Sequence, residues 1–289
     1  MRLLELFSGT HSIGKVAKEM GYEVYSLDKD LGDACPFGSG YKSHKHFKED
    51  IMTWNYKQFP PNYFDVITAS PVCLWWSNLR QTNYGKILKG YDEPFSPKLF
   101  WADIERYGIP MVNKITEILE YFNPPNYWIE NPSTSKMKTY LGEENSVVVD
   151  YCKYSDWGYK KPTRFWISKG IEDNFTPLIC KYDCQNMIQG SKHHKTNLSS
   201  QKFLCPDGKH RNGIIIRELQ KQGKFQDWNF KKTSSTKKHT KTLANVGGGS
   251  NRLERYRIPE KLVRSLLTAC VDTQYTQYTH SEGIVVPTE

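Results

Sequence analysis

The chain has 289 residues, of which 38% are hydrophobic and 13% aromatic, which is enough to bury the core of one large domain or of one domain with an insertion. Its longest apolar runs fall far short of the roughly 18 residues that cross a bilayer, so a membrane span is excluded. Seven cysteines and the lack of a secretory leader pattern predict a soluble, intracellular protein in a reducing compartment, such as a bacterial cytoplasm or an infected host cell.

The formal net charge of +9 is concentrated in one segment. Between Lys169 and Lys241 there are 15 Lys and Arg against 6 Asp and Glu, so the rest of the chain, with 25 of each kind, is neutral. Such a segment favours a polyanionic partner, because neutralising phosphates releases counterions. A solvated lysine-rich surface without a partner is the other interpretation, and both stay open on charge alone.

The sequence predicts strands that alternate with helices. The first 30 residues form a β-α-β pattern, in which residues 11–22 have apolar side chains at helical spacing and end near Gly21. A second helix is expected at 112–122. Strands are expected at 2–9, 23–30, 64–70, 126–132, 146–152 and 163–168. This alternation predicts an α/β fold with a mostly parallel sheet covered by helices.

The periodic pattern breaks down near residue 170 and returns close to the end of the chain. The intervening sequence is polar and rich in Gly and Lys, which predicts an insertion. At 258–270 apolar residues again recur at helical spacing, and Pro259 suits a first helical turn. We therefore expect one more core helix after the insertion.

Polar residues and glycines at the predicted strand ends indicate a ligand site. Gly9 and Gly14 lie in the turn FSGTHSIG, where a residue without Cβ lets a ligand approach the N–H groups that begin a helix. The turn lacks the full G-x-G-x-x-G pattern, which disfavours a nicotinamide dinucleotide and keeps a plain tight turn as the alternative. Asp28 closes the second strand, where its carboxylate can accept hydrogen bonds from ribose hydroxyls, and Asp50 lies in the next loop. Together these loops predict a nucleoside-bearing ligand.

Three reactive side chains follow later strands. Cys73 lies in ASPVC just behind a predicted strand, and a buried, inert thiol is the usual state of a lone cysteine. Glu130 and Asn131 end an apolar strand, where an unpartnered carboxylate is costly to bury. Arg164 lies within an aromatic strand. A thiol, a carboxylate and a guanidinium at one sheet edge predict a reactive site.

Four stretches, LELFSGTHSIG, ASPVC, WIENP and YKKPTRFW, resemble in their order and separation the motifs of the cytosine-C5 DNA methyltransferase family, and in particular its phage and virus members. The resemblance implies a Rossmann-like, S-adenosylmethionine-dependent methyltransferase sheet with a small inserted target-recognition domain. We therefore expect a catalytic domain at 1–168 and 243–275, the basic target-recognition insertion at 169–242, and a flexible tail at 276–289.

The resemblance also implies roles for single residues. Cys73 would be the nucleophile that adds to cytosine C6, Glu130 the acid at N3, Asn131 its structural neighbour, and Arg164 the group that holds the base carbonyl. The reaction would be methyl transfer to C5 of a cytosine flipped out of double-stranded DNA, by a monomeric enzyme. The residues implied for cofactor binding are Phe7, Ser8, Gly9, Gly14, Asp28, Asp50, Ile51 and Pro71.

Two other functions stay open. An RNA cytosine-C5 methyltransferase would use the same chemistry on a different substrate. A catalytically silent nucleic-acid-binding protein would keep the fold, and Val72, Pro132 and Lys161, which depart from the family pattern, allow for it. A small-molecule methyltransferase is disfavoured because it leaves the basic segment unexplained.

The insertion also contains residues that can bind zinc. Cys180 and Cys184 are followed by His193, His194, Cys205 and His210. The C-x3-C pair of Cys180 and Cys184 and the C-x4-H pair of Cys205 and His210 together offer three thiolates and an imidazole to a tetrahedral ion. The spacing is loose, so unrelated surface residues are the favoured interpretation and a zinc site is the alternative.

Overall fold

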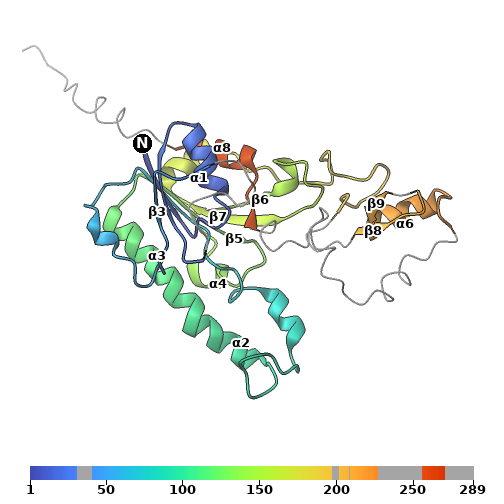
Figure 1. The fold of residues 1–289 in the computed structure, drawn as a ribbon, viewed down its shortest axis with the longest axis horizontal. Helices are drawn as coiled ribbons and strands as arrows, with labels where there is room; N and C mark the ends of the chain where they lie inside the picture. Colours follow the sequence, from blue (N-terminus) through green and yellow to red (C-terminus); the bar gives the residue numbers. More distant parts are fainter. Residues whose placement is uncertain (31–40, 197–201, 208, 227–255, 271–289) are drawn as a thin grey trace, which may run out of the picture. The chain divides into compact units, whose positions relative to one another are not determined.

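A computed structural model describes residues 1–30, 41–196, 202–207, 209–226 and 256–270 (Figure 1). A seven-stranded sheet in the order β3-β2-β1-β4-β5-β7-β6 organises them. Its strands are β1 Arg2–Leu6, β2 Glu23–Leu27, β3 Lys45–Phe47, β4 Val66–Ala69, β5 Asn126–Pro132, β6 Ser146–Asp150 and β7 Pro162–Ile167. The helices and the separate two-stranded sheet are α1 Ser12–Glu19, α2 Pro97–Asp103, α3 Ile109–Phe122, α4 Lys138–Leu141, α5 Lys169–Asn174, β8 Lys202–Leu204, β9 His210–Asn212, α6 Gly213–Lys221 and α8 Glu260–Thr268.

Most of the large sheet is parallel. β1 pairs in parallel with β2 and β4, β2 with β3, and β4 with β5. β7 runs the other way, because the N–H of Ser168 bonds to the carbonyl of Tyr127 and that of Ile167 to the carbonyl of Asn145, each at 3.0 Å. The end of β7 therefore lies beside the starts of β5 and β6. The predicted α/β class is confirmed, with one reversed strand that the sequence pattern did not reveal.

The strands bury both of their faces. Leu4 and Leu6 of β1 belong to the core cluster that contains Val112 and Ile115 of α3. Successive side chains of a strand point to opposite faces, so Glu5 lies on the other face, where it contacts the start of α1. Helices α1 and α3 thus cover opposite faces of the sheet, as Figure 1 also shows. A sheet covered on both sides accounts for the near-continuous apolar strands of the sequence.

The last described helix packs beside the first. Tyr22 donates a hydrogen bond from Oη to the carbonyl of Leu267 at 3.5 Å, and Arg264 forms an ion pair with Glu19 (Figure 1). Leu262, Val263 and Leu266 of α8 are all fully buried. The predicted helix at the end of the chain is therefore present and belongs to the core.

The contacts divide the chain into two units. Unit 1 comprises Met1–Val147, Arg164–Pro177 and Val263–Glu289, and unit 2 comprises Val148–Thr163 and Leu178–Leu262. Much of the predicted insertion (197–201, 208 and 227–242) and the whole tail at 276–289 lie outside the described residues, so the predicted domain boundaries stay predictions. None of the helices in the described ranges is long and apolar enough to cross a membrane.

Candidate active site

Four strands of unit 1 end together at the edge that carries most of the predicted site. The pairing aligns Leu6 with Leu27 and with Ala69, and Ala69 with Ile129. The residues that follow each aligned position are Phe7, Asp28, Ser70 and Glu130. In α/β sheets the carboxyl ends of parallel strands are where ligands bind, so the register supports the predicted location of the site.

The loop after β1 has an unusual backbone. Phe7, Gly9 and His11 have φ angles of 58°, 48° and 54°, which lie in the left-handed region. Such a conformation costs a non-glycine residue about 1–3 kcal/mol and persists only where the surroundings fix it. Here the N–H of Gly9 bonds to Oδ2 of Asp28 at 2.9 Å, and the N–H of Ser8 bonds to the carbonyl of Leu27 at 3.0 Å. The end of β2 therefore determines the shape of the β1 loop.

Glu5, which was not predicted from the sequence, supports the loop that carries the predicted cofactor residues. Its side chain is buried, and Oε1 accepts the N–H groups of Ile13 at 3.2 Å and Gly14 at 3.1 Å. These N–H groups belong to the first turn of α1, which has no acceptors of its own, and a carboxylate there also interacts favourably with the helix dipole. Ser26 donates to Oε2 at 3.3 Å. A carboxylate in the middle of the apolar strand LLEL was the available signal.

Neighbouring side chains require a residue without a Cβ at position 14. A Cβ at this position would lie 2.5 Å from the Tyr41 hydroxyl oxygen and 2.6 Å from Oε2 of Glu5, both far inside van der Waals contact. The glycine therefore allows the helix to approach Glu5. This packing requirement exists whether or not Gly14 also borders a cofactor, which stays a prediction.

The loop after β3 carries the next predicted cofactor residues. Asp50 begins a helical turn, because its Oδ1 accepts the N–H of Met52 at 3.0 Å and its carbonyl accepts that of Trp54 at 2.9 Å. Lys29 reaches Oδ2 of Asp50 at 3.4 Å and links the loops after β2 and β3. Ile51 is buried in the main core cluster. Asp28 and Asp50 thus lie on neighbouring loops of the same edge.

Cys73 lies in a tight turn after β4. The N–H of Trp76 bonds to its carbonyl at 3.2 Å, and the thiol is only partly buried. The neighbouring side chains Val72 and Leu74 are 41% and 51% exposed, so the turn leaves the core surface. Cys73 is therefore not fully buried, contrary to the alternative interpretation, and its reactivity stays a prediction.

Asn131 joins the turn that carries Cys73 to β5. Its side chain is fully buried, and Nδ2 donates to the carbonyl of Pro71 at 3.2 Å. Glu130, the preceding residue, is 8% exposed. The predicted structural neighbour of the acid is thus a residue that holds the nucleophile turn against the end of β5.

Arg164 lies near the start of β7. Because β7 is antiparallel to β5, the start of β7 lies toward the carboxyl end of β5, where Glu130 is. The guanidinium donates to Oγ of Ser146 at 2.6 Å and to Oε2 of Glu143 at 2.7 Å. The Lys138 ammonium, which bonds to Glu143, and the charge of Arg164 hold the pKa of the Glu143 carboxyl below its usual value. Arg164 is therefore held by an exposed carboxylate as well as by the strand.

A buried ion pair supports the segment after Cys73. Arg80 pairs with Asp103 of α2 and donates to Oη of Tyr91 at 2.8 Å, and Tyr91 donates to Oδ2 of Asp103 at 2.5 Å. Both charged side chains are about nine-tenths buried, and burial raises the pKa of Tyr91. This network was not predicted, because its three residues are far apart in the chain.

The structure corrects the predicted set of zinc ligands. Cys180 and Cys184 lie together, but their neighbours are Cys152 and His194. Cys205 is buried elsewhere, with Ile216 and Phe225, and the side chain of His210 lies outside the described part of the chain. Sequence spacing missed Cys152 because it lies before β7. The favoured interpretation of unrelated surface residues is wrong for Cys180, which is 3% exposed.

A comparison with known sequences identifies the family. No family model matches the chain. A probable DNA (cytosine-5)-methyltransferase of Frog virus 3 (isolate Goorha) is 39% identical over 191 residues, which cover 65% of this chain and 79% of that protein. The chain belongs to the cytosine-C5 DNA methyltransferase family. The family predicted from the four motifs is thereby confirmed, including its likeness to viral members, and with it the prediction of a methyltransferase enzyme.

Solved structures show weaker likeness. The Dnmt2 methyltransferase of S. pombe is 14% identical, with a TM-score of 0.37, and the match covers 58% of this chain and 49% of that chain. An S-adenosylmethionine-dependent methyltransferase from Archaeoglobus fulgidus is 15% identical, with a TM-score of 0.30, and the match covers 52% of this chain and 64% of that chain. This chain therefore spans about half the length of the yeast methyltransferase.

Proposed function

We propose that this family member transfers a methyl group from S-adenosylmethionine to C5 of a cytosine flipped out of DNA, through a covalent bond between Cys73 and C6. The observation that carries the proposal is the Asn131 hydrogen bond to Pro71, which holds a partly exposed thiol next to the strand end that bears Glu130. The DNA substrate is supported by the viral relative, whose name specifies DNA.

The residues at the sheet edge fit the cofactor. The hydroxyl groups of Ser8 and Ser70, after β1 and β4, are buried and have no hydrogen-bond partner among the described residues. Buried polar atoms are normally paired, so two such atoms at the predicted pocket indicate a polar ligand. Asp28 and Asp50 supply carboxylates on the adjoining loops. When bound, S-adenosylmethionine supplies a methyl group on a cationic sulfur.

The chemistry assigns each reactive side chain a task. The Cys73 thiolate adds its electron pair to C6, while protonated Glu130 donates a hydrogen bond or proton to N3. C5 then carries the electron density needed to form a bond to the methyl carbon, and the bonding pair of the broken sulfur–methyl bond stays on the cofactor sulfur. A base removes the C5 proton, any proton given to N3 returns to Glu130, and the thiolate leaves C6 as the aromatic ring is restored.

The Arg164 guanidinium would stabilise charge on the base carbonyl. In the structure it is bonded to Ser146 and Glu143. Glu143 is 58% exposed, so its carboxylate can move into solvent. We propose that Glu143 and Ser146 hold Arg164 in position, and that the substrate carbonyl accepts a hydrogen bond from one of the guanidinium N–H groups.

We assign DNA contact to the basic segment between Lys169 and Lys241, whose exposed cations include Lys192, Lys209 and Lys224. When Lys and Arg neutralise DNA phosphates, the affinity for DNA falls as the salt concentration rises. The slope of log affinity against log salt concentration is set by the number of phosphate contacts. Replacing Lys209 and Lys224 by Gln should weaken DNA binding and reduce the salt slope by about two. The matched control replaces two exposed lysines of unit 1, Lys48 and Lys57, and should leave the slope unchanged.

The decisive experiment for the reaction uses labelled S-adenosylmethionine and a duplex in which 5-fluorocytosine replaces cytosine. Fluorine cannot leave C5 as a proton does, so the covalent adduct accumulates and survives a denaturing gel. Wild type and Cys270→Ser, which changes a thiol at the end of α8, should form the labelled adduct, and Cys73→Ser should not. An adduct with RNA alone would favour the RNA methyltransferase, and none with either substrate would favour the silent binder.

A further inference from the structure

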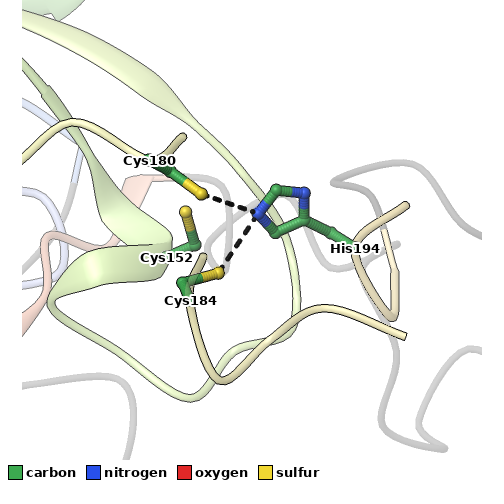
Figure 2. A group of neighbouring side chains, drawn as sticks. All are labelled: Cys152, Cys180, Cys184 and His194. Carbon is green, nitrogen blue, oxygen red and sulfur yellow. Dashed lines mark hydrogen bonds between the residues drawn. The ribbon is translucent and has the colours of Figure 1, made fainter. Parts of the chain in front are cut away.

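Four side chains of unit 2 converge on one point. The ligand atoms of Cys152, Cys180, Cys184 and His194 all lie within 4.8 Å of one another (Figure 2). The sulfur atoms of Cys180 and Cys184 are 3.5 and 3.3 Å from Nε2 of His194. Three of the four residues are buried, and Cys184 is partly buried. Figure 2 shows the three thiols and the imidazole pointing into the same space.

The hydrogen bonds to His194 do not account for this arrangement. A neutral imidazole Nε2 has either one N–H or one lone pair, so it can serve only one of the two thiols that approach it. The three cysteines also form no disulfide with one another. Three thiols and one ring nitrogen at such short distances therefore form a set of possible metal ligands.

A tetrahedral zinc ion does account for it. Zn–S bonds of about 2.3 Å and Zn–N bonds of about 2.0–2.1 Å at tetrahedral angles place sulfur and nitrogen about 3.5 Å apart, and two sulfurs about 3.8 Å apart. The two sulfur–nitrogen distances, 3.5 and 3.3 Å, agree with the first value. Thiolate ligands select zinc over calcium or magnesium, which require oxygen.

We propose that Cys152, Cys180, Cys184 and His194 bind one structural zinc ion. Four protein ligands complete a tetrahedral shell and leave no position for water or substrate, which is the arrangement of a structural rather than a catalytic site. The four ligands include none of the residues assigned to methyl transfer, so the zinc proposal does not depend on that function.

A positive charge lies beside the segment that carries Cys180. Lys160 donates a hydrogen bond from Nζ to the carbonyl of Cys180 at 3.3 Å and forms an ion pair with Asp150 at 3.1 Å. Three thiolates and one Zn²⁺ leave a net charge of about −1. A neighbouring ammonium group is favourable for such a site.

Asn186 and Asp150 hold the segments that carry the ligands. Asn186 is 1% exposed; its Nδ2 donates to the carbonyls of Cys152 at 2.9 Å and Ser155 at 2.6 Å, and its Oδ1 accepts the N–H of Gly158 at 3.2 Å. Asp150 accepts the N–H of Cys180 at 2.8 Å. Hydrogen bonds of this kind, made behind the metal ligands, orient the ligands toward the ion.

The fold explains why unit 2 needs a metal here. Residues 175–196 contain no helix or regular strand, and Cys152 comes from the 3₁₀ helix Tyr151–Lys153 that follows β6. A segment with so little secondary structure gains few backbone hydrogen bonds on folding. A metal that joins residues 152, 180, 184 and 194 supplies the missing stabilisation, because its binding energy becomes folding energy.

The experiment measures zinc in the full-length protein, purified without chelators, by mass spectrometry. Wild type should contain about one zinc per chain, and Cys184→Ser and His194→Gln less than about a tenth of that. Cys205→Ala is the matched control, because Cys205 belonged to the sequence-predicted set but lies elsewhere in unit 2, and it should keep its zinc. Zinc-free wild type, or loss of zinc in Cys205→Ala with retention in Cys184→Ser, would overturn the proposal.

A cobalt titration keeps the proposal testable if the variants fold poorly. Wild-type protein stripped of metal under reducing conditions should bind Co²⁺ with the visible bands of a tetrahedral site and the sulfur-to-cobalt charge-transfer band of thiolate ligands. The Cys205→Ala spectrum should be the same. A spectrum typical of octahedral oxygen ligation would contradict the assignment, since it requires ligands other than these four.

Discussion

Asn131 at the end of β5 holds the carbonyl of Pro71, two residues before the candidate nucleophile, through a 3.2 Å hydrogen bond. The position of Cys73 therefore depends on a buried amide in a neighbouring strand. Asn131→Ala should leave the Pro71 carbonyl without its donor, lower the free energy of unfolding by about 1–3 kcal/mol, and slow adduct formation. S-adenosylmethionine affinity, measured by calorimetry, should change little. Unchanged adduct formation would show that the turn holds its shape without this bond.

Glu5 should be as important for the cofactor loop as the residues that face it. Glu5→Gln keeps one acceptor oxygen but removes the charge that interacts with the first turn of α1, so we expect a loss of stability of about 1–3 kcal/mol and weaker cofactor binding. Urea unfolding and calorimetry measure the two effects. Glu49→Gln, at an exposed position before Asp50, is the matched control and should be neutral.

Replacing one partner of the Arg80–Asp103 pair should lower the free energy of unfolding more than replacing both partners. Arg80→Met leaves a buried, unpaired Asp103 and should destabilise the protein by about 3–5 kcal/mol. Adding Asp103→Leu should recover much of that loss, because the second substitution removes the uncompensated charge. Urea unfolding of both single variants and the double variant gives the coupling. Additive single effects would show that the two residues do not depend on each other.

The contribution of Glu143 should depend on pH. Its pKa in the folded protein lies below the ordinary value of 4.5, first because Lys138 bonds to it and then because of the Arg164 charge. The stabilisation is therefore present above pH 4.5 and is lost as pH falls through the lower, folded-state pKa. The stability difference between wild type and Glu143→Gln should shrink between pH 7 and pH 3.5. A constant difference would mean that the Glu143 charge contributes nothing.

Asn186 should affect zinc without being a ligand. Asn186→Ala removes the three hydrogen bonds that join the segments of Cys152 and Cys184 but leaves all four ligands in place, so zinc affinity should fall by about 10–100-fold. Competition with a chromogenic chelator measures this. The neighbouring exposed Gln185→Ala is the control and should release zinc at the wild-type chelator concentration.

The sequence allowed the edge of the sheet to be predicted because each signal there is local. Gly9, Asp28 and Cys73 each follow the end of an apolar strand closely in the sequence. The carboxyl ends of parallel strands meet at one edge of the sheet, so these residues could be placed together from the sequence alone. The three-residue strand β3 was not predicted, since Lys45–Phe47 is too short to show an alternating pattern.

The remaining features depend on contacts between distant parts of the chain. The reversal of β7 is fixed by hydrogen bonds to Tyr127 and Asn145, which no periodicity in residues 162–167 reveals. Two of the four proposed zinc ligands were not found by spacing: Cys152 is separated from Cys180 by a whole strand, and the C-x4-H spacing favoured His210 over His194. The carboxylate of Glu5 stands out within the apolar strand LLEL. Its role follows only from its hydrogen bonds with the start of α1, which the sequence does not show.

The Asp28 carboxylate, which accepts the N–H of Gly9, has a structural role in addition to its predicted role in ligand binding. Asp28 is the residue predicted to hold the ribose, and it also keeps the left-handed loop between Phe7 and His11 in shape. Weaker cofactor binding in Asp28→Ala would therefore combine a lost ligand contact with a relaxed loop. Asp28→Asn retains an acceptor oxygen for Gly9, so the difference between the two substitutions separates recognition of the ligand from preorganisation of its pocket.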